Sequence, residues 1–436
     1  LDALAARGVR FENAISPSPL CAPARACLAS GRDYHRARVA TNRNDYPLDQ
    51  PTYYAMLREA EYHVAGVGKF DLRKASFDWG IDGQKYLREW GFTEGINSEG
   101  KWDAIMSATG SMPPALAKHA QQDGLDSAAL AERARNAAAE TIPPIKPKGP
   151  YIDFLHRSGL AETHIRDFWD RDPYQDTRPT PLPDDAYCDN WIAANALRLL
   201  ANLPNNQPWH LVVNFAGPHD PVDVTQSMHE RWQGIHFPAA NDNHHLDAAT
   251  HGKIRCNYAA IIENIDRHLG QLIQAVHARG ELDNTMIVYS SDHGEMLGDH
   301  NLWGKKTYYQ PSVGVPLIIA GPGIVSDVVC RAPVALHDLA PTFLEYAAAR
   351  PLPDADAVSL EPILAGQATQ TREFVISGLQ KWRMVFDGRF KLVIREGQDP
   401  ILFDLETDPL ERSNIAATRS EQIRAMKKIL DQTLRD

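Results

Sequence analysis

Histidine, aspartate and lysine gather in four short segments of this chain, and an isolated cysteine lies in a fifth. The segments are CAPAR (21–25), GKFDL (68–72), GPHDPVD (217–223), SDHGEMLGDH (291–300) and GKKTYY (304–309). Carboxylate oxygens suit a hard cation such as Ca²⁺ or Mg²⁺, and lysines can bind the outer oxygens of a sulfate or phosphate. The residue types therefore predict a site for a divalent metal and an anion.

The polar segments lie beside apolar, β-rich runs at residues 62–68, 210–217, 284–291 and 315–323. Sites of doubly wound sheets gather just past the carboxyl ends of strands. The candidates there are Lys69, Asp71, His219, Asp220, Asp223, Asp292, His293 and Lys305. Their joint placement at strand ends favours chemistry, although each segment alone also fits a turn or a helix start.

Several other residues have simpler interpretations. A single lysine such as Lys69 is usually a solvated loop residue, and the pair His244 and His245 lies in a polar loop where solvated histidines are expected. Trp303 and Trp382 could line a pocket, but burial in a core is the commoner role of tryptophan.

Helical patterns alternate with the four apolar runs. The clearest, at 254–279, places isoleucines and leucines on one stripe, and another begins at Pro51 and runs to about Glu61. This alternation predicts an α/β fold with a doubly wound, mostly parallel sheet covered on both faces.

The pattern changes after about residue 366. Short strands punctuated by Asp-Gly or Gly predict an antiparallel meander, closed by a helix from about Ser420. We therefore expect a catalytic domain over residues 1–365 and a smaller subdomain over 366–436. The alanine-rich stretch 103–150 is expected to form helices and a loop inserted into the larger domain.

Composition narrows the class of protein. The 436 residues carry a formal net charge of −11 and are 43% hydrophobic, which is enough apolar material for a large core. The negative net charge argues against a nucleic acid or an anionic membrane as partner. The sequence has no stretch of 18 apolar residues, so we expect no membrane-spanning helix. The five cysteines have neither the spacing of a zinc module nor that of a disulfide framework. LDALAARGVRF (1–11) is typical of the interior of a domain, so we expect an N-terminal piece to precede it.

The segment CAPAR fits the pattern Cys-x-Pro-x-Arg, and LASGR (28–32) follows it. With the other four segments in order, and with LFDLETDPLERSNIA (402–416) near the end, the chain resembles the formylglycine-dependent sulfatases of the alkaline-phosphatase-like superfamily. The resemblance covers nearly the whole chain. It implies the superfamily's α/β sheet and hydrolysis of a sulfate monoester.

The resemblance also implies roles for individual residues. Cys21 matches the cysteine that a maturation enzyme oxidises to formylglycine, whose hydrated form carries the nucleophilic hydroxyl and completes the metal site. Asp292 and His293 match metal ligands, and Arg25 matches the arginine that holds the diol. Lys69 and Lys305 match lysines that neutralise sulfate oxygens. His219 matches the histidine near the leaving oxygen and is expected to be the general acid.

The sequence departs from the family pattern in two places. Asp71 stands where many relatives have histidine, so a cationic donor is missing there. The family's pair of aspartate ligands belongs to a strand that would precede Leu1, and we expect that N-terminal strand to be missing from this sequence. Cys27 lies outside the minimal motif and is interpreted as a buried thiol.

The expected metal is Ca²⁺ in preference to Mg²⁺ or Mn²⁺, and the expected partners are a sulfated small molecule or saccharide and the formylglycine-generating enzyme. Further contacts to the group that carries the sulfate are predicted for Asp71, Asp220, Asp223 and Trp303. Two alternatives remain open: a phosphonate monoester or phosphodiester hydrolase, and an inactive relative that binds sulfated sugars. Residue patterns indicate neither the oligomeric state nor a cytoplasmic or periplasmic location.

Overall fold

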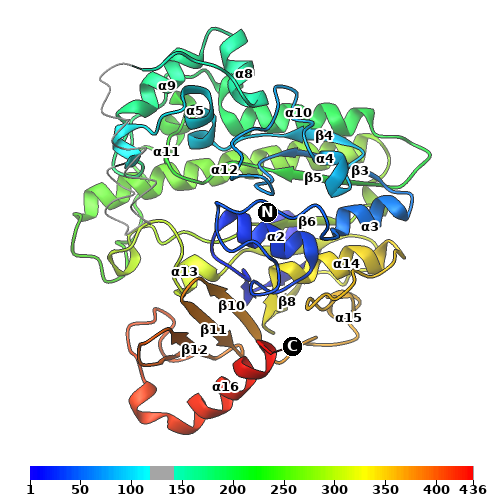
Figure 1. The fold of residues 1–436 in the computed structure, drawn as a ribbon, viewed down its shortest axis with the longest axis vertical. Coiled ribbons are helices and arrows are strands. Elements are labelled where there is room, and N and C mark those ends of the chain that lie inside the picture. The colour runs from blue at the N-terminus through cyan, green and yellow to red at the C-terminus, as the bar shows by residue number, and fades with distance from the viewer. Residues whose placement is uncertain (118–141, 436) are drawn as a thin grey trace. The chain divides into compact units, whose positions relative to one another are not determined.

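The structure, a computed structural model, describes residues 1–117 and 142–435 (Figure 1). Contacts between α-carbons divide the chain into two compact units. The first unit is Leu1–Tyr62, Asp71–Ala75 and His277–Asp436, and the second is His63–Phe70 and Ser76–Val276.

The main sheet of the first unit has four strands in the order β6-β7-β1-β8. These are β1 (Gly8–Phe11), β6 (Ile287–Ser290), β7 (Leu317–Ala320) and β8 (Val328–Cys330). β1 and β8 are parallel, whereas β7 runs antiparallel to both β1 and β6. Ser290 at the end of β6 pairs with Leu317 at the start of β7. The connection between them, residues 291–316, therefore lies at the carboxyl end of β6.

The remaining elements of this part of the first unit are short. They are α1 (Asp2–Ala5), β2 (Ala14–Ile15), α2 (Cys21–Ser30), α3 (Tyr53–Glu59), η2 (Leu282–Asn284), η3 (Asp299–Asn301), α13 (Gln310–Val313), β9 (Val334–Ala335), η4 (Leu336–Asp338), α14 (Leu339–Tyr346) and α15 (Glu361–Leu364). β2 and β9 form a parallel pair. Apolar side chains of β1, β7 and α15 share one core with the segment that follows β9.

The end of the chain forms an antiparallel meander in the order β10-β11-β12-β13. Its elements are β10 (Val375–Leu379), β11 (Trp382–Phe386), β12 (Phe390–Arg395), β13 (Ile401–Asp404), η5 (Ala416–Thr418) and α16 (Ser420–Thr433). Alternation along each strand gives the sheet two buried faces. Leu392 faces Met426 and Leu430 of α16, whereas Val393 belongs to a second core with Ile15 and Val313. Figure 1 shows α16 running beside this sheet.

The second unit is built on a parallel sheet in the order β4-β3-β5. Its elements are β3 (His63–Gly68), α4 (Leu87–Trp90), β4 (Glu94–Asn97), α5 (Lys101–Thr109), α8 (Pro150–Arg157), α9 (Ala161–Trp169), η1 (Asp184–Ala186), α10 (Cys188–Asn202), β5 (Trp209–Asn214), α11 (Gln226–Trp232) and α12 (Ala248–Ala278). After His63, β3 consists only of valine, alanine and glycine, as expected for a buried central strand, and α10 packs against it.

The predicted elements are confirmed where the structure describes them. The four apolar runs overlap β3, β5, β6 and β7, the pattern at 254–279 overlaps α12 up to its end at Ala278, and the meander and terminal helix are present. Outside the meander most strand pairs are parallel, and the antiparallel β7 makes the sheet mixed. Part of the predicted insertion, residues 118–141, lies outside the described residues. Among those described, no helix combines the length and apolarity needed to span a membrane.

Candidate active site

Cys21 is the first residue of α2. Leu20 before it is extended, and Pro23 is tolerated in the first turn because backbone N–H groups there have no partner within the helix. One of those groups, the N–H of Ala22, donates to Asn42 Oδ1 at 3.0 Å. Gly31 ends the helix with a φ of +65°, a conformation that favours glycine. The cysteine is thus held at a helix start, and it is 1% exposed.

Asp292 and His293 meet Cys21 from the loop after β6. Cys21 Sγ lies 3.2 Å from His293 Nε2. His293 Nδ1 lies 2.9 Å from the carbonyl oxygen of Gly294, so Nδ1 carries the hydrogen and Nε2 is left to act as a ligand. Ser16 Oγ donates to the carbonyl oxygen of Asp292 at 2.6 Å, which fixes the loop beside α2.

The same three residues offer a set of metal ligands. Within the part of the chain that the structure describes, Cys21, Asp292 and His293 form a group whose ligand atoms all lie within 4.8 Å of one another. A carboxylate, an imidazole and the side chain of residue 21 are compatible with a divalent cation. If residue 21 carried hydroxyl groups in place of the thiol, the set would be better suited to a hard cation.

Arg25 is one helical turn beyond Cys21, which places both side chains on the same face of α2. Its Nε donates to Asp292 Oδ2 at 2.9 Å. Burial by itself lowers the pKa of Arg25, but the charges of Asp292, Asp71 and Cys21 raise the pKa above its ordinary value. The guanidinium therefore brings a fixed positive charge to a site that would otherwise be acidic.

Asp71 belongs to the first unit and is 1% exposed. Its φ of +55° is unusual for aspartate, and its Oδ1 lies 3.5 Å from Lys74 Nζ. The negative charge acts on Arg25, as the pKa of that residue indicates. Its predicted contact with substrate stays a prediction.

Lys305 lies in the connection between β6 and β7, two residues after Trp303. Its neighbours fix the backbone there: the N–H of Gly304 donates to Glu295 Oε1 at 2.6 Å, and the N–H of Lys306 donates to the carbonyl oxygen of Pro19 at 3.2 Å. Since Pro19 lies two residues before Cys21, the first residue of α2, the Lys305 segment adjoins the start of that helix. The roles of Lys305 and Trp303 stay predictions.

Cys27 has the properties of a structural thiol. It is fully buried, and burial raises its pKa well above the ordinary value, with Asp33 and Asp356 raising it further. A thiol in this environment stays protonated and inert.

Lys69 follows β3 in the second unit. Its backbone N–H donates to the carbonyl oxygen of Asn214 at 3.0 Å, which extends the pairing of β3 with β5. Lys69 as a whole is only 3% exposed, so its interpretation as a solvated loop residue is wrong. By contrast, the side chain of His244 is 77% exposed, as expected for a solvated histidine.

His219 follows β5 and is oriented by Asp220. His219 Nδ1 lies 2.7 Å from the carbonyl oxygen of Asp220 and 3.0 Å from its Oδ1. Nδ1 therefore carries a hydrogen, and Nε2 is the atom left for chemistry. Trp102 Nε1 donates to Asp220 Oδ2 at 2.9 Å, so one carboxylate joins the histidine to α5.

Asp223 has a structural partner. Its Oδ1 lies 2.6 Å from Lys101 Nζ, and both side chains are 2% exposed. Lys101 Nζ also donates to the hydroxyl of Tyr187 at 3.1 Å and to the carbonyl oxygen of Pro221 at 3.3 Å. This buried ion pair fixes the turn after His219, and the predicted substrate contact of Asp223 stays a prediction.

Two residues of this neighbourhood were not singled out from the sequence. Asp189 Oδ1 accepts the backbone N–H groups of Ala216 and Gly217 at 2.8 and 2.9 Å, and a Cβ on Gly217 would lie 2.4 Å from Asp189 Oδ2. The second of these residues is Lys101, the partner of Asp223. Asp189 lies at the start of α10 and not after a strand, and Lys101 follows β4, a short strand that is not among the four apolar runs of the sequence.

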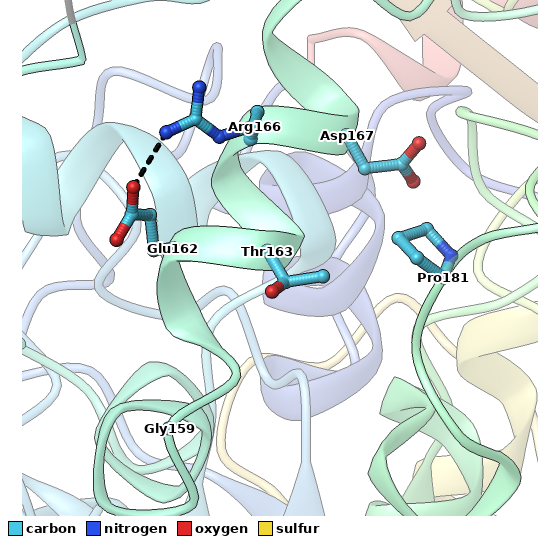
Figure 2. Close-up of a pocket in the computed structure, with 6 residues that line it drawn as sticks. All are labelled: Gly159, Glu162, Thr163, Arg166, Asp167 and Pro181. Atoms are coloured by element: carbon cyan, nitrogen blue, oxygen red, sulfur yellow. Dashed lines mark hydrogen bonds and ion pairs between the residues drawn. The ribbon is translucent and has the colours of Figure 1, made fainter.

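A separate hollow of about 390 Å³ lies on the second unit (Figure 2). It is lined by Gly159, Glu162, Thr163, Arg166, Asp167 and Pro181. Arg166 pairs with Glu162 at 2.6 Å on the exposed side of α9, and none of the predicted site residues is among the six. The hollow is therefore distinct from the candidate active site.

Comparison with known proteins agrees with this geometry. The family model for sulfatases matches residues 1–349, and that for the C-terminal part of N-sulphoglucosamine sulphohydrolase matches residues 298–436. The chain is 28% identical to a choline-sulfatase of Rhizobium meliloti, over 95% of this chain and 77% of the relative. It is 22% identical to an N-acetylglucosamine-6-O-sulfatase of Bacteroides thetaiotaomicron, over 99% and 81%.

Solved structures share the fold. The phosphonate monoester hydrolase of Agrobacterium radiobacter matches with a TM-score of 0.76 and 21% identity, over 99% of this chain and 89% of that one. A protein solved with its substrate D-glucosamine-2-N,6-O-disulfate matches with a TM-score of 0.73 and 19% identity, over 100% and 92%. The fold is alkaline-phosphatase-like. The chain belongs to the sulfatase family and is a sulfuric ester hydrolase.

Proposed function

We propose that this sulfatase hydrolyses a sulfate monoester of a carbohydrate, with formylglycine formed from Cys21 as the nucleophile and Ca²⁺ as the metal. The observation that carries the proposal is the contact of Cys21 with His293, beside Asp292 and at the start of α2. A nucleophile next to a metal site and a permanent positive charge is the arrangement that sulfuryl transfer needs.

The residues present fit a divalent cation. Asp292 and His293 would hold the metal together with residue 21, and the ion would supply charge stabilisation for the ionised hydroxyl and the sulfate. Arg25 neutralises Asp292 and orients its carboxylate. Because the sequence resembles a family with two further aspartate ligands, the set on this chain is proposed as part of the full site.

The remaining residues are proposed to handle the substrate. Lys69 and Lys305 would bind the outer oxygens of the sulfate, which lowers the free energy of the charge that builds up as the ester bond breaks. His219 would donate its Nε2 proton to the leaving oxygen, since Asp220 already engages Nδ1. Asp71, Asp220, Asp223 and Trp303 are proposed contacts to the group that carries the sulfate.

Carbohydrate as the substrate class is supported by the names of two similar proteins, one an N-acetylglucosamine-6-O-sulfatase and the other solved with a disulfated glucosamine. We further propose a catalytic domain over residues 1–365, a C-terminal subdomain over residues 366–436, and a formylglycine-generating maturation enzyme as partner.

A second candidate function is hydrolysis of phosphonate monoesters or phosphodiesters. It is favoured by the TM-score of 0.76 to the phosphonate monoester hydrolase. One matured preparation should be assayed on glucosamine 6-sulfate, choline sulfate, an aryl sulfate, a phenylphosphonate monoester and a phosphodiester. Treatment with EGTA should abolish the main activity and Ca²⁺ should restore it. Faster turnover of the phosphorus esters than of every sulfate would contradict the first proposal.

A further inference from the structure

Glu411, in the C-terminal segment DPLERSN (408–414), contacts two residues that are distant in the sequence, Gln310 and Lys391. Its φ is +55° and its side chain is 1% exposed. Its Oε2 accepts the backbone N–H of Gln310 at 2.5 Å. Asn414 of the same segment instead binds the C-terminal sheet: its Oδ1 accepts the N–H groups of Leu402 and Ala416. Glu411 therefore connects the C-terminal segment to the backbone at Gln310.

The partner of Glu411 is Lys391 of β12, whose side chain is fully buried. Val393, the neighbour on the same face of the strand, lies in the apolar core with Met384 and Phe386, and Lys391 Nζ lies 6.0 Å from the ring centre of Phe403. Burial lowers the pKa of Lys391, and the charge of Glu411 recovers only part of that shift. A buried ion pair is a costly substitute for apolar residues in such a core, so stability alone does not explain it.

The ion pair and one tryptophan hold the backbone that follows Lys305. Lys391 Nζ donates to the carbonyl oxygen of Tyr308 at 2.8 Å and to Gln310 Oε1 at 3.2 Å. Trp382 Nε1 donates to the carbonyl oxygen of Lys306 at 3.1 Å. Glu411 accepts the N–H of Gln310. Main-chain groups of residues 306, 308 and 310 are therefore each bound by a side chain from the C-terminal sheet or from the loop that follows it.

The opposite side of this segment touches the candidate active site. Lys306 N–H donates to Pro19, just before the Cys21 helix, and Gly294 N–H donates to the carbonyl oxygen of Ser312 at 2.9 Å. A Cβ on Gly294 would lie 1.9 Å from the carbonyl oxygen of Pro311, so the two backbone segments are packed too closely for any side chain at position 294. Lys305 is therefore carried by a backbone clamped between the metal-ligand loop and the C-terminal sheet.

We propose that the Lys391–Glu411 ion pair is a positioning device for Lys305. Neither residue is catalytic: they hold the 306–310 backbone so that the preceding lysine presents its ammonium group at a fixed place. The role in turnover rests on the proposed function of Lys305, but the clamp itself can be tested without any substrate.

The first test is limited tryptic digestion of the folded protein, with cleavage after Lys305 and Lys306 followed by mass spectrometry. Glu411→Leu should speed cleavage at these two sites by about 10-fold or more, since local opening governs proteolysis. Cleavage after Lys427 and Lys428 in α16 should not change. Arg389→Gln is the matched control, because it breaks a partly exposed ion pair with Asp404 in the same sheet and should leave cleavage at Lys305 unaltered. Unchanged cleavage in Glu411→Leu, or equal acceleration in α16, would overturn the proposal.

The second test separates positioning from stability. The double variant Lys391→Met with Glu411→Leu leaves no unpaired buried charge and should regain most of the melting temperature lost by Glu411→Leu. Its turnover of a sulfate monoester should stay reduced, by about 100-fold as expected for a misplaced binding group. Recovery of turnover together with the melting temperature would indicate a merely structural pair and overturn the proposal.

The third test is a double-mutant cycle with Lys305→Ala. If Glu411 acts through Lys305, Glu411→Leu should cost little further turnover once the lysine is gone. Fully additive losses would overturn the proposal. Wild-type turnover in Lys305→Ala would instead refute the proposed function of Lys305, while the digestion would still report on the clamp.

Discussion

The Sγ atom of Cys21 lies 3.2 Å from Nε2 of His293, although 271 residues separate the two along the chain. Two structural features create this contact: a helix that begins at the cysteine, and a loop that leaves β6 and is held by Ser16. Neither residue would be notable alone. Together with Asp292 and Arg25 they form the group that we propose supplies a nucleophile precursor, two metal ligands and a fixed cation.

Arg25→Lys should lower turnover of a sulfate monoester by about 100-fold or more, because a lysine cannot reproduce the Nε contact to Asp292 while keeping its charge beside residue 21. Steady-state kinetics on matured enzyme measures the effect. Arg38→Lys, which alters an exposed pair with Asp49, is the control and should retain full activity. Similar losses in both variants would contradict the role of Arg25.

His219→Gln should lower turnover in a way that depends on the leaving group. For a carbohydrate sulfate, whose leaving alcohol needs a proton, the loss should be roughly 10²- to 10⁴-fold. For an aryl sulfate with an acidic phenol the loss should be much smaller. Comparing kcat for the two substrates checks this, and an equal loss on both would argue against general acid catalysis.

Glu99 should make stability depend on pH. It is fully buried and accepts the N–H of Ile152 at the start of α8, and burial raises its pKa from 4.5 to about 7. The folded state therefore binds this proton more tightly than the unfolded state. The favourable contribution is complete below pH 4.5 and is lost as pH rises to about 7, on the order of 3 kcal/mol in the free energy of unfolding.

Urea unfolding at several pH values measures this dependence. Glu99→Gln removes the titrating group, so the unfolding free energy of the native chain minus that of the variant should fall by about 3 kcal/mol as pH rises from 4.5 to 7. A difference that stays constant over this range would show that Glu99 does not titrate there.

Gly68→Ala should disturb the strand end that carries Lys69. The φ of Gly68 is +103°, and an added Cβ would lie 1.9 Å from the carbonyl oxygen of Asn214 on β5. We expect a loss of about 3 kcal/mol in the free energy of unfolding together with reduced activity. Gly252→Ala in α12, where an added Cβ meets no atom within 4 Å, is the control and should stabilise by about 0.5–1 kcal/mol. Equal tolerance of both substitutions would contradict this account of Gly68.

Local patterns were enough to predict β3, β5, β6, β7 and the meander, with the polar segments at the strand ends, whereas the short strands β1, β2, β4, β8 and β9 were not predicted. β3 is a run of small apolar residues, and Lys69 follows it directly, so both could be located from the sequence. The four strands of the meander were marked by their turns. The terminal helix was likewise predicted from its position after them and from its pattern.

Contacts that depend on distant packing could not be predicted. Nothing near Lys391 in the sequence indicates that it is buried and faces Glu411, and nothing near Lys101 indicates Asp223 as its partner. The direction of β7 was also hidden, because an apolar run of four residues fits either a parallel or an antiparallel neighbour. Such features are decided by the tertiary structure.

The central claim is that Cys21 is the precursor of the nucleophile. The direct measurement is the mass of the tryptic peptide that spans residues 11–25, from protein expressed with a formylglycine-generating enzyme and assayed on a sulfate monoester. The account predicts the mass of formylglycine at position 21 in the active preparation and loss of activity in Cys21→Ala. An active preparation in which this peptide carries only an unmodified thiol would contradict it.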